Sequence, residues 1–194
     1  MIGDVLVLLK NRLNSHFRPM VAGTSDQIWE DKAVFVDGDL KSDQIPFKLD
    51  AVTILLYNIE QEKELRQSDP YARVSADGAS RKSKPDIALN LYVLFVVRFK
   101  DYGQGLHYLS LIIRYFQAYN RLDHSNAPEL GDAIDHLVVE LLSLTASQQN
   151  ELWGFLRTGY LPSVAYKVKT VIFIAVDALP QTEMSEYSLI GRPL

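Results

Sequence analysis

The sequence predicts a single α+β domain in which helices pack against a mixed β-sheet. Its length of 194 residues is typical of one domain and is sufficient to bury a substantial core. A long stretch between Pro85 and Tyr102 is apolar on both faces of an extended chain. Segments with helical periodicity lie before and after it. The order helix, strands, helices and strand favours an α+β sandwich.

Composition excludes several classes of function. Hydrophobic residues make up 47% and charged residues 23% of the chain, which is ordinary for a globular domain. A net charge of −4 argues against a general nucleic-acid binder. The absence of cysteine excludes disulfides and thiolate chemistry. Met1–Leu13 is too short and too charged for a signal peptide or a membrane span. We expect a protein made in the cytoplasm, with no nucleic-acid or membrane partner.

The central strand is predicted over Ile87–Phe99. Leu91, Val93 and Phe95 fall on one side of an extended chain, while Leu94 and Val96 fall on the other. Tyrosine, valine and phenylalanine dominate the segment and favour a strand over a helix. A straight strand of this length would reach roughly 40 Å, so we expect a bend or a bulge.

The elements before the central strand follow from periodicity and turn residues. Apolar residues at three- and four-residue spacing from Ile2 to Phe17 predict an amphipathic helix that Pro19 ends. Ala33–Val36 is predicted to be a short strand, with Asp37-Gly38 as a hairpin-type turn. A second strand is predicted over Leu49–Ile59.

The polar stretch between Glu60 and Lys84 predicts a long exposed loop inserted in the domain, least ordered at Ser75–Ser83, which has no apolar anchors. We therefore predict one domain over residues 1–178, with the exposed loop at about residues 67–84. Residues 179–194 contain Pro180, Gly191 and Pro193 and are predicted to form an extended C-terminal arm.

After the central strand the sequence predicts a turn at Gly103–Gly105, three helices and a last strand. The helices are expected over residues 106–119, over residues 129–144, and from near Ser147 to Gly159. Thr145 and Gln148 have the spacing of a capping box. The last strand is expected over Tyr166–Val176.

Chemically active residue types are scattered without the spacing of a catalytic or metal site. Asp132 and His136 are four residues apart in a predicted helix, which favours a surface pair over a metal site. Ser163 lacks the glycines of a nucleophile elbow and is interpreted as a turn or strand-start serine. Gly103-Gln-Gly105 lacks the Lys-Ser/Thr that completes a phosphate loop. We therefore predict no catalytic, cofactor-binding or metal-binding residues. The histidines, which show no ligand spacing, are His16, His107, His124 and His136.

Two further groups allow both a structural and a functional interpretation. The carboxylates Glu60, Glu62 and Glu64 could bind a metal or act in acid/base chemistry, but the interleaved basic residues favour a solvated strand end. Trp153 is interpreted as a core or partly buried residue. The tyrosines fit either a core or a protein interface; they are Tyr108, Tyr115, Tyr119 and Tyr160.

Several segments together resemble one family in order and spacing. The resemblance covers roughly Met1–Ala178 and is most specific at Leu152-Trp-Gly and Leu161-Pro-Ser-Val. The family is the tail-terminator, or cap, protein of extracellular contractile injection systems, which are phage-tail-like particles, and particularly its short Bacteroidetes-type members. The other segments that carry the resemblance are Val52–Arg66, Leu89–Phe95, Gly105–Gln117, Glu140–Gly154 and Tyr160–Lys169.

This resemblance implies a structural protein with no cofactor. It implies a ring, in this family a hexamer, on the end of the inner tube distal to the baseplate, where the ring stops elongation and holds the last sheath layer. The implied partners are other copies of the chain, the inner tube protein and the sheath protein. Assembly is implied to take place in the cytoplasm, within a particle that is released from the cell. The implied fold is that of phage tail terminators.

The residues alone also allow two alternative functions. One is a different tail component, such as a tube or baseplate adaptor. The other is a small enzyme whose site would be assembled from scattered residues such as Asp132, His136 and Glu140.

Overall fold

A computed structural model describes residues 2–21, 30–36, 45–62, 72–74, 80–82, 87–131 and 134–173, and the statements below refer to these residues. They form helices α1 (Ile2–Val21), α2 (Tyr102–Ala118) and α3 (Ala146–Phe155). The strands are β1 (Ala33–Phe35), β2 (Ala51–Gln61), β3 (Ala72–Val74), β4 (Ser80–Lys82), β5 (Ile87–Arg98), β6 (Arg121–Asp123), β7 (His136–Leu142) and β8 (Ser163–Phe173).

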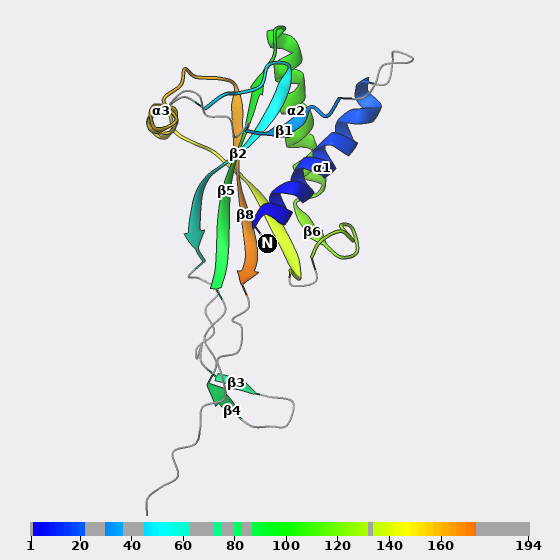
Figure 1. The fold of residues 1–194 in the computed structure, drawn as a ribbon, viewed down its shortest axis with the longest axis vertical. Helices are drawn as coiled ribbons and strands as arrows, with labels where there is room; N and C mark the ends of the chain where they lie inside the picture. Colours follow the sequence, from blue (N-terminus) through cyan, green and yellow to red (C-terminus); the bar gives the residue numbers. More distant parts are fainter. Residues whose placement is uncertain are drawn as a thin grey trace, which may run out of the picture.

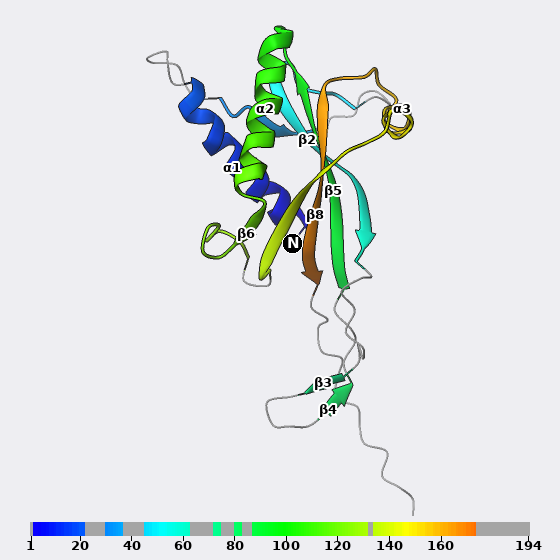
Figure 2. The ribbon, with the colours of Figure 1, turned by 180° about the vertical axis from the view of Figure 1, so that it is seen from behind.

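The main sheet has six strands in the order β1-β2-β5-β8-β7-β6. All neighbouring pairs are antiparallel except β1 and β2, which are parallel. Figures 1 and 2 show α1 and α2 on one side of this sheet and α3 on the other side, near one end. The predicted α+β class, with a mixed sheet and packed helices, is confirmed.

Strand β5 lies in the interior of the sheet, as predicted. Leu91, Val93 and Phe95 are fully buried in the cluster under α1 and α2, while Leu94 and Val96 are buried in the cluster under α3. The predicted irregularity is also present. The register with β8 shifts between Leu89 and Leu91, and the register of β2 with β5 shifts between Leu56 and Asn58. Such bulges bend a strand and increase its twist.

Helix α1 buries the stripe that its periodicity predicted. Val5, Leu9, Leu13 and Phe17 are at most 1% exposed. The helix continues two residues beyond Pro19 and ends at Val21, because a proline in the last turn removes only one helical hydrogen bond.

Asn14, on the buried side of α1, holds strand β1 in place. Its Nδ2 donates to the carbonyl oxygen of Ala33 at 2.9 Å, and its Oδ1 accepts from the amide of Ala33 at 2.8 Å. Both polar groups of this buried amide side chain are therefore satisfied. The contact joins the first helix to the edge of the sheet.

The predicted helix over residues 129–144 is wrong. Residues 136–142 form strand β7, which pairs with both β6 and β8. Leu137 and Val139 are buried, whereas Val138 is only partly so, so the alternation has the period of a strand. Leu130 and Ile134 are buried from the connection that precedes the strand. The four-residue spacing of Leu130 and Ile134 matches a helix, although no helix forms there.

Three predicted boundaries also need correction. Ala33–Val36 does not form a hairpin with the next strand, because β1 is parallel to β2 and parallel strands need a longer connection; Asp37 and Gly38 lie outside the described residues. Gly103–Gly105 is the first turn of α2, with Asp101 as its N-cap, and not a loop. Helix α3 ends at Phe155 instead of reaching Gly159.

The stretch predicted as an exposed loop contains a two-stranded antiparallel sheet. Ala72–Val74 pairs with Ser80–Lys82, which corrects the prediction for these residues, and Figure 1 draws this pair beyond the end of the main sheet. The remainder of residues 67–84 and the predicted arm at 179–194 lie outside the described residues.

Substitution of Leu91 by Asp tests the central position of β5. Leu91 is 0% exposed, so the variant buries an unpaired carboxylate and should lose about 4 kcal/mol or more of its free energy of unfolding. Chemical denaturation followed by circular dichroism measures this loss. Ile87→Asp is the matched control on the same strand and face, because Ile87 is 46% exposed. A cooperatively folded Leu91→Asp protein as stable as the control would refute the assignment.

Candidate assembly surfaces

Helix α3 is fixed to the sheet by its cap and by one tryptophan. The amide of Gln148 donates to Thr145 Oγ1 at 3.3 Å and the amide of Thr145 donates to Gln148 Oε1 at 2.9 Å, which confirms the predicted capping box. Trp153 is 6% exposed. Its ring lies 6.1 Å from Phe47 and 5.6 Å from Tyr160 between ring centroids. The interpretation of Trp153 as a core residue is confirmed.

A groove runs along α3 and the segment that follows it. Arg157, just beyond the helix, has a φ of 52°, so the chain reverses in the left-handed region. Tyr160 is 63% exposed at the groove and Phe155 is 74% exposed on the helix. Tryptophan, tyrosine and arginine are enriched at protein interfaces. The groove has a volume of about 620 Å³ and is lined by Ala146, Gln149, Asn150, Trp153, Gly154, Arg157, Thr158, Gly159 and Tyr160.

The face of the sheet that carries α3 becomes polar toward the other end. The Tyr92 hydroxyl donates a short hydrogen bond to Glu60, and the Lys167 ammonium lies 5.7 Å from the centroid of the Tyr92 ring. Burial and the hydrogen bond to Glu60 raise the pKa of Tyr92 to about 12. Tyr92 therefore remains a protonated donor at neutral pH, and the negative charge of this cluster resides on the carboxylates.

Neighbouring pairs extend this polar surface across four strands. Asn90 is 3% exposed and its Nδ2 donates to Glu62 Oε2 at 2.8 Å. Lys169 Nζ lies 2.7 Å from Glu140 Oε1 on the adjacent strand. Glu60 lies at the end of β2 and Glu62 directly follows the strand, as the interpretation of a solvated strand end predicted; Glu64 lies outside the described residues.

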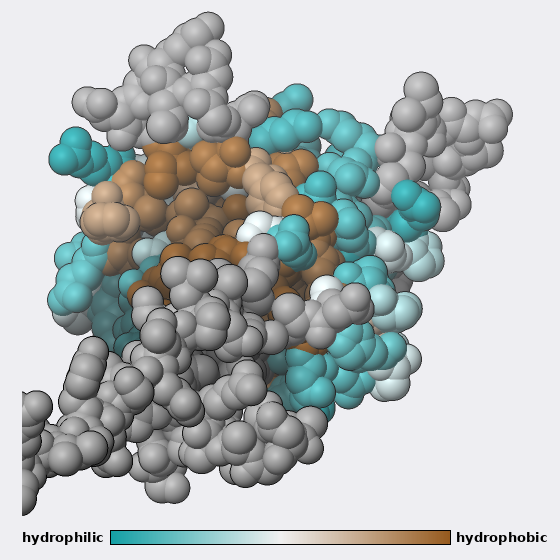
Figure 3. Space-filling model, turned by 60° about the horizontal axis from the view of Figure 1, so that its bottom comes forward, coloured by the Kyte–Doolittle hydropathy of each residue, from teal (hydrophilic) through white to brown (hydrophobic). Residues whose placement is uncertain are grey.

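The opposite face is apolar at the same end. Ile59 and Ile87 are 43% and 46% exposed, and Leu89 and Leu56 are partly buried against the larger core cluster. Figure 3 looks toward this end of the molecule and shows hydrophobic side chains gathered in a broad patch that hydrophilic side chains border. An exposed apolar patch with a polar rim is typical of a protein interaction site.

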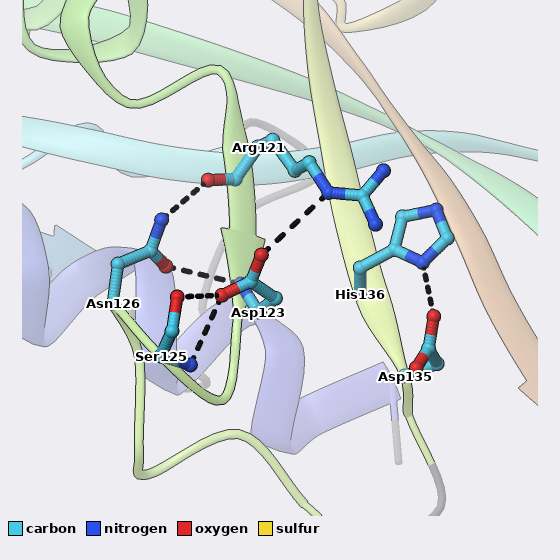
Figure 4. Close-up of polar contacts among 6 residues, drawn as sticks. All are labelled: Arg121, Asp123, Ser125, Asn126, Asp135 and His136. Atoms are coloured by element: carbon cyan, nitrogen blue, oxygen red, sulfur yellow. Dashed lines mark hydrogen bonds and ion pairs between the residues drawn. The ribbon is translucent and has the colours of Figure 1, made fainter.

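An ordered turn connects β6 to the segment before β7. Asp123 Oδ1 accepts from the amide of Ser125 at 3.0 Å and from its hydroxyl, and these hydrogen bonds, that of the hydroxyl first, hold the pKa of Asp123 below its usual range. Asn126 Nδ2 donates to the carbonyl oxygen of Arg121 at 2.8 Å. Figure 4 shows the His136 ring directed at Asp135 and not at Ser125. The turn has no nucleophile–base pair.

Arg12 of α1 locks this turn against the first helix. Its Nη2 donates to the carbonyl oxygen of Asn126 at 2.6 Å and to Glu129 Oε2 at 2.8 Å. Its Nε lies 2.6 Å from Glu129 Oε1, so the guanidinium contacts the carboxylate through two nitrogens. Sequence reasoning missed this contact because more than a hundred residues separate Arg12 from its partners.

His16 lies at the junction of α1 and α2. Its ring centroid is 5.1 Å from that of Tyr115, and within the described part of the chain its buried Nε2 has no hydrogen-bond partner. Burial, and then the positive charge of Arg114, lower the pKa of His16. The neutral imidazole is therefore the form that fits this junction.

The described residues that were considered as catalytic or metal-binding candidates lie apart in the structure. His136 is on strand β7 and not on the predicted helix, and its ring contacts Asp135; Asp132 lies outside the described residues. Ser163 begins β8. Among the described residues, no three His, Cys, Asp or Glu side chains gather as metal ligands. Within the same residues, no helix is long and apolar enough to cross a membrane.

The chain thus forms an α+β domain that exposes an aromatic groove, a polar sheet face and an apolar sheet end. The chain matches the Pvc16 N-terminal domain over residues 4–185, which is most of its length, and it belongs to that family. The assignment supports the structural interpretation of the chain, and the alternative of a small enzyme is abandoned.

Two solved structures share the fold at low sequence identity. One is a cryo-EM structure of the sheath/tube terminator of PVC, an extracellular contractile injection system, in the extended state, with a TM-score of 0.58 and 15% identity over 97% of this chain. The other is the tube-terminating cap of the anti-feeding prophage, with a TM-score of 0.52 and 16% identity over 94% of this chain. The matches span 65% and 59% of those chains, respectively. A search of curated protein sequences finds no match.

Substitution of Trp153 by Ala tests how α3 is anchored. Removal of a nearly buried indole from the smaller core cluster should lower the free energy of unfolding by about 3–5 kcal/mol. Phe155→Ala, two residues away and 74% exposed, is the matched control and should change it by less than about 0.5 kcal/mol. Urea denaturation of both variants measures the difference. Equal effects would contradict the described orientation of the helix.

The junction at His16 predicts a pH-dependent stability. Because the folded pKa is lower than the unfolded one, the unfolded chain binds more protons as the pH falls through about 6.5, and folded stability decreases. His16→Gln should therefore flatten the change in unfolding free energy between about pH 5 and 7. Denaturation at several pH values measures the slope. His124→Gln, at an exposed histidine, is the control; an unchanged slope in His16→Gln would contradict this account.

Proposed function

We propose that this protein is the terminator of a contractile injection system. The proposed ring of identical subunits, a hexamer in keeping with the family resemblance, binds the distal end of the inner tube, stops its elongation and holds the last layer of sheath. The observation that carries the proposal is the family match over residues 4–185. The fold likeness to a sheath/tube terminator and a tube-terminating cap supports it. We propose assembly in the cytoplasm, within a particle that acts outside the cell.

The distribution of surfaces suits such a role. A ring of identical subunits requires two different patches on each subunit that fit each other around the closed circle, and a cap also needs a surface for the polymer end. The aromatic groove along α3, the polar face around Tyr92 and the apolar end at Ile59 and Ile87 are three chemically distinct surfaces. They lie on one sheet, which holds them in a fixed relation.

The proposed function divides the chain into a domain and an arm. We propose that residues 1–178 form the terminator domain and that residues 179–194 act as an extended arm, which becomes ordered when it contacts a neighbouring subunit or the last sheath layer. Such an arm would add contact area without a core of its own. A tube or baseplate adaptor remains the second candidate, since it would also be a structural oligomer.

Deletion of the gene tests the proposed role in the producing cell. Tube and sheath subunits should still polymerise, but particles should be scarce or irregular in length, with sheath that contracts or is lost early, because nothing stops growth or holds the last layer. Negative-stain electron micrographs measure particle number and length. Complementation with the unaltered gene is the control. Intact particles of normal length and stability would exclude the terminator role.

Removal of residues 179–194 separates the arm from the domain. The truncated protein should keep the unfolding transition of the full chain and yet complement the deletion poorly. Light scattering after size-exclusion chromatography reports its oligomeric state. A truncated protein that restores normal particles would show that the arm is dispensable, while leaving the terminator role of the domain intact.

A further inference from the structure

Strand β2 has an edge that its neighbour covers only in part. Strand β1 pairs with β2 through residues 52–54 alone, and β2 continues to Gln61. Among the described residues, no strand lies outside β2 from Leu55 onward. Asn58 to Gln61 are all exposed. An open edge offers unpaired backbone groups to another chain.

The backbone hydrogen bonds show which groups face outward. The amide of Val52 donates to Lys32 at 2.7 Å, on the β1 side, whereas the amide of Glu62 donates to Ala88 at 2.8 Å, on the β5 side. Successive residues of a strand alternate between its two sides. Counting back from Glu62, Gln61 and Ile59 direct their amides and carbonyls outward. Asn58 Oδ1 accepts from the amide of Ile59 at 2.9 Å, which confirms that this amide is not used in the sheet.

The side chains along this edge fall into two chemical classes. Glu60 contacts Tyr92 and lies on the polar face. Ile59 pairs with Leu91 and lies on the apolar face at 43% exposure. On the polar face, three neighbouring strands carry an acidic, a neutral and a basic side chain in turn. These are Glu60 on β2, Tyr92 on β5 and Lys167 on β8. A cation on an added strand would stand beside Glu60, which is the favourable cross-strand arrangement.

We propose that the edge of β2 from Asn58 to Gln61 is a binding site for an extended segment of another protein, in which basic residues alternate with apolar ones. The segment adds as a seventh strand. Its backbone bonds to the amide and carbonyl of Gln61 and to the carbonyl of Ile59, whose amide Asn58 already occupies. Its basic side chains face Glu60, and its apolar side chains extend the patch at Ile59. This inference stands on the geometry of the edge and does not rest on the proposed function.

Binding of a synthetic peptide to the full chain tests the proposal. The probe is a blocked, fluorescently labelled peptide of alternating Lys and Val; the matched probe replaces each Lys by Glu. Fluorescence anisotropy at low salt should show at least about tenfold tighter binding of the Lys peptide, and the difference should shrink as salt rises. Equal binding of both peptides would overturn the charge assignment.

Two substitutions distinguish the contribution of the backbone edge to peptide binding from that of the Glu60 charge. Gln61→Pro removes an outward amide without touching the pairs with β5, as edge prolines do, and should weaken binding of the Lys peptide by about tenfold; Gln61→Ala should not. Glu60→Gln keeps an acceptor for Tyr92 and removes the charge, so it should weaken binding of the Lys peptide and reduce its salt dependence. Unchanged binding in both Gln61→Pro and Glu60→Gln would overturn the proposal.

Amide hydrogen exchange in the unaltered protein locates the contact without relying on a variant. Addition of the Lys peptide should slow exchange at Gln61 and leave Glu60, whose amide already faces β5, as it was. Protection that rises with protein concentration in the absence of peptide would assign the edge to a second copy of the chain. That result, or protection elsewhere only, would overturn the proposal.

Discussion

The rest of the structure depends on the burial of strand β5 on both of its faces. A strand with Leu91, Val93 and Phe95 on one side and Leu94 and Val96 on the other must be covered by two layers. Helices α1 and α2 supply one layer, and α3 with Phe47 supplies the other. The long path of the chain around the sheet is the consequence, because no single helix could cover both faces.

The two layers are unequal in extent, and this inequality creates the exposed surfaces. The larger cluster includes residues of α1, α2 and the strand ends, whereas the smaller one is confined to the surroundings of Trp153 and Phe47. Beyond the reach of α3 the sheet replaces apolar residues by Tyr92, Lys167 and Glu60. One end of β5 is thus buried on both faces, whereas the other end lies beside the exposed surfaces of the same sheet.

Local patterns in the sequence were sufficient for β5, α1, α2 and the cap of α3, because periodicity, strand-forming residues and the Thr145–Gln148 spacing act over a few residues. These local patterns failed where contacts with residues distant in sequence determine the secondary structure. Residues 136–142 become a strand because β8 pairs with them, although Leu130 and Ile134 complete a helical spacing. Asn14 of α1 bonds the backbone of Ala33 in β1, and Arg12 contacts Asn126 and Glu129 beyond β6; neither pair is close in sequence. Among the weighed site residues, those on β2 and at Trp153 were placed correctly, while His136 was assigned to the wrong element.

The composition and length of the sheet edges limit pairing between identical sheets. Each outer strand, β1 and β6, has three residues, which leaves little length for pairing with an identical sheet. Among the described residues, the uncovered segment at the end of β2 carries Glu60 and uses the Asn58 side chain to occupy the amide of Ile59. An approaching copy of the same edge would place like charges opposite each other, which is unfavourable. The composition of this edge therefore disfavours pairing with an identical edge and suits the basic strand proposed above.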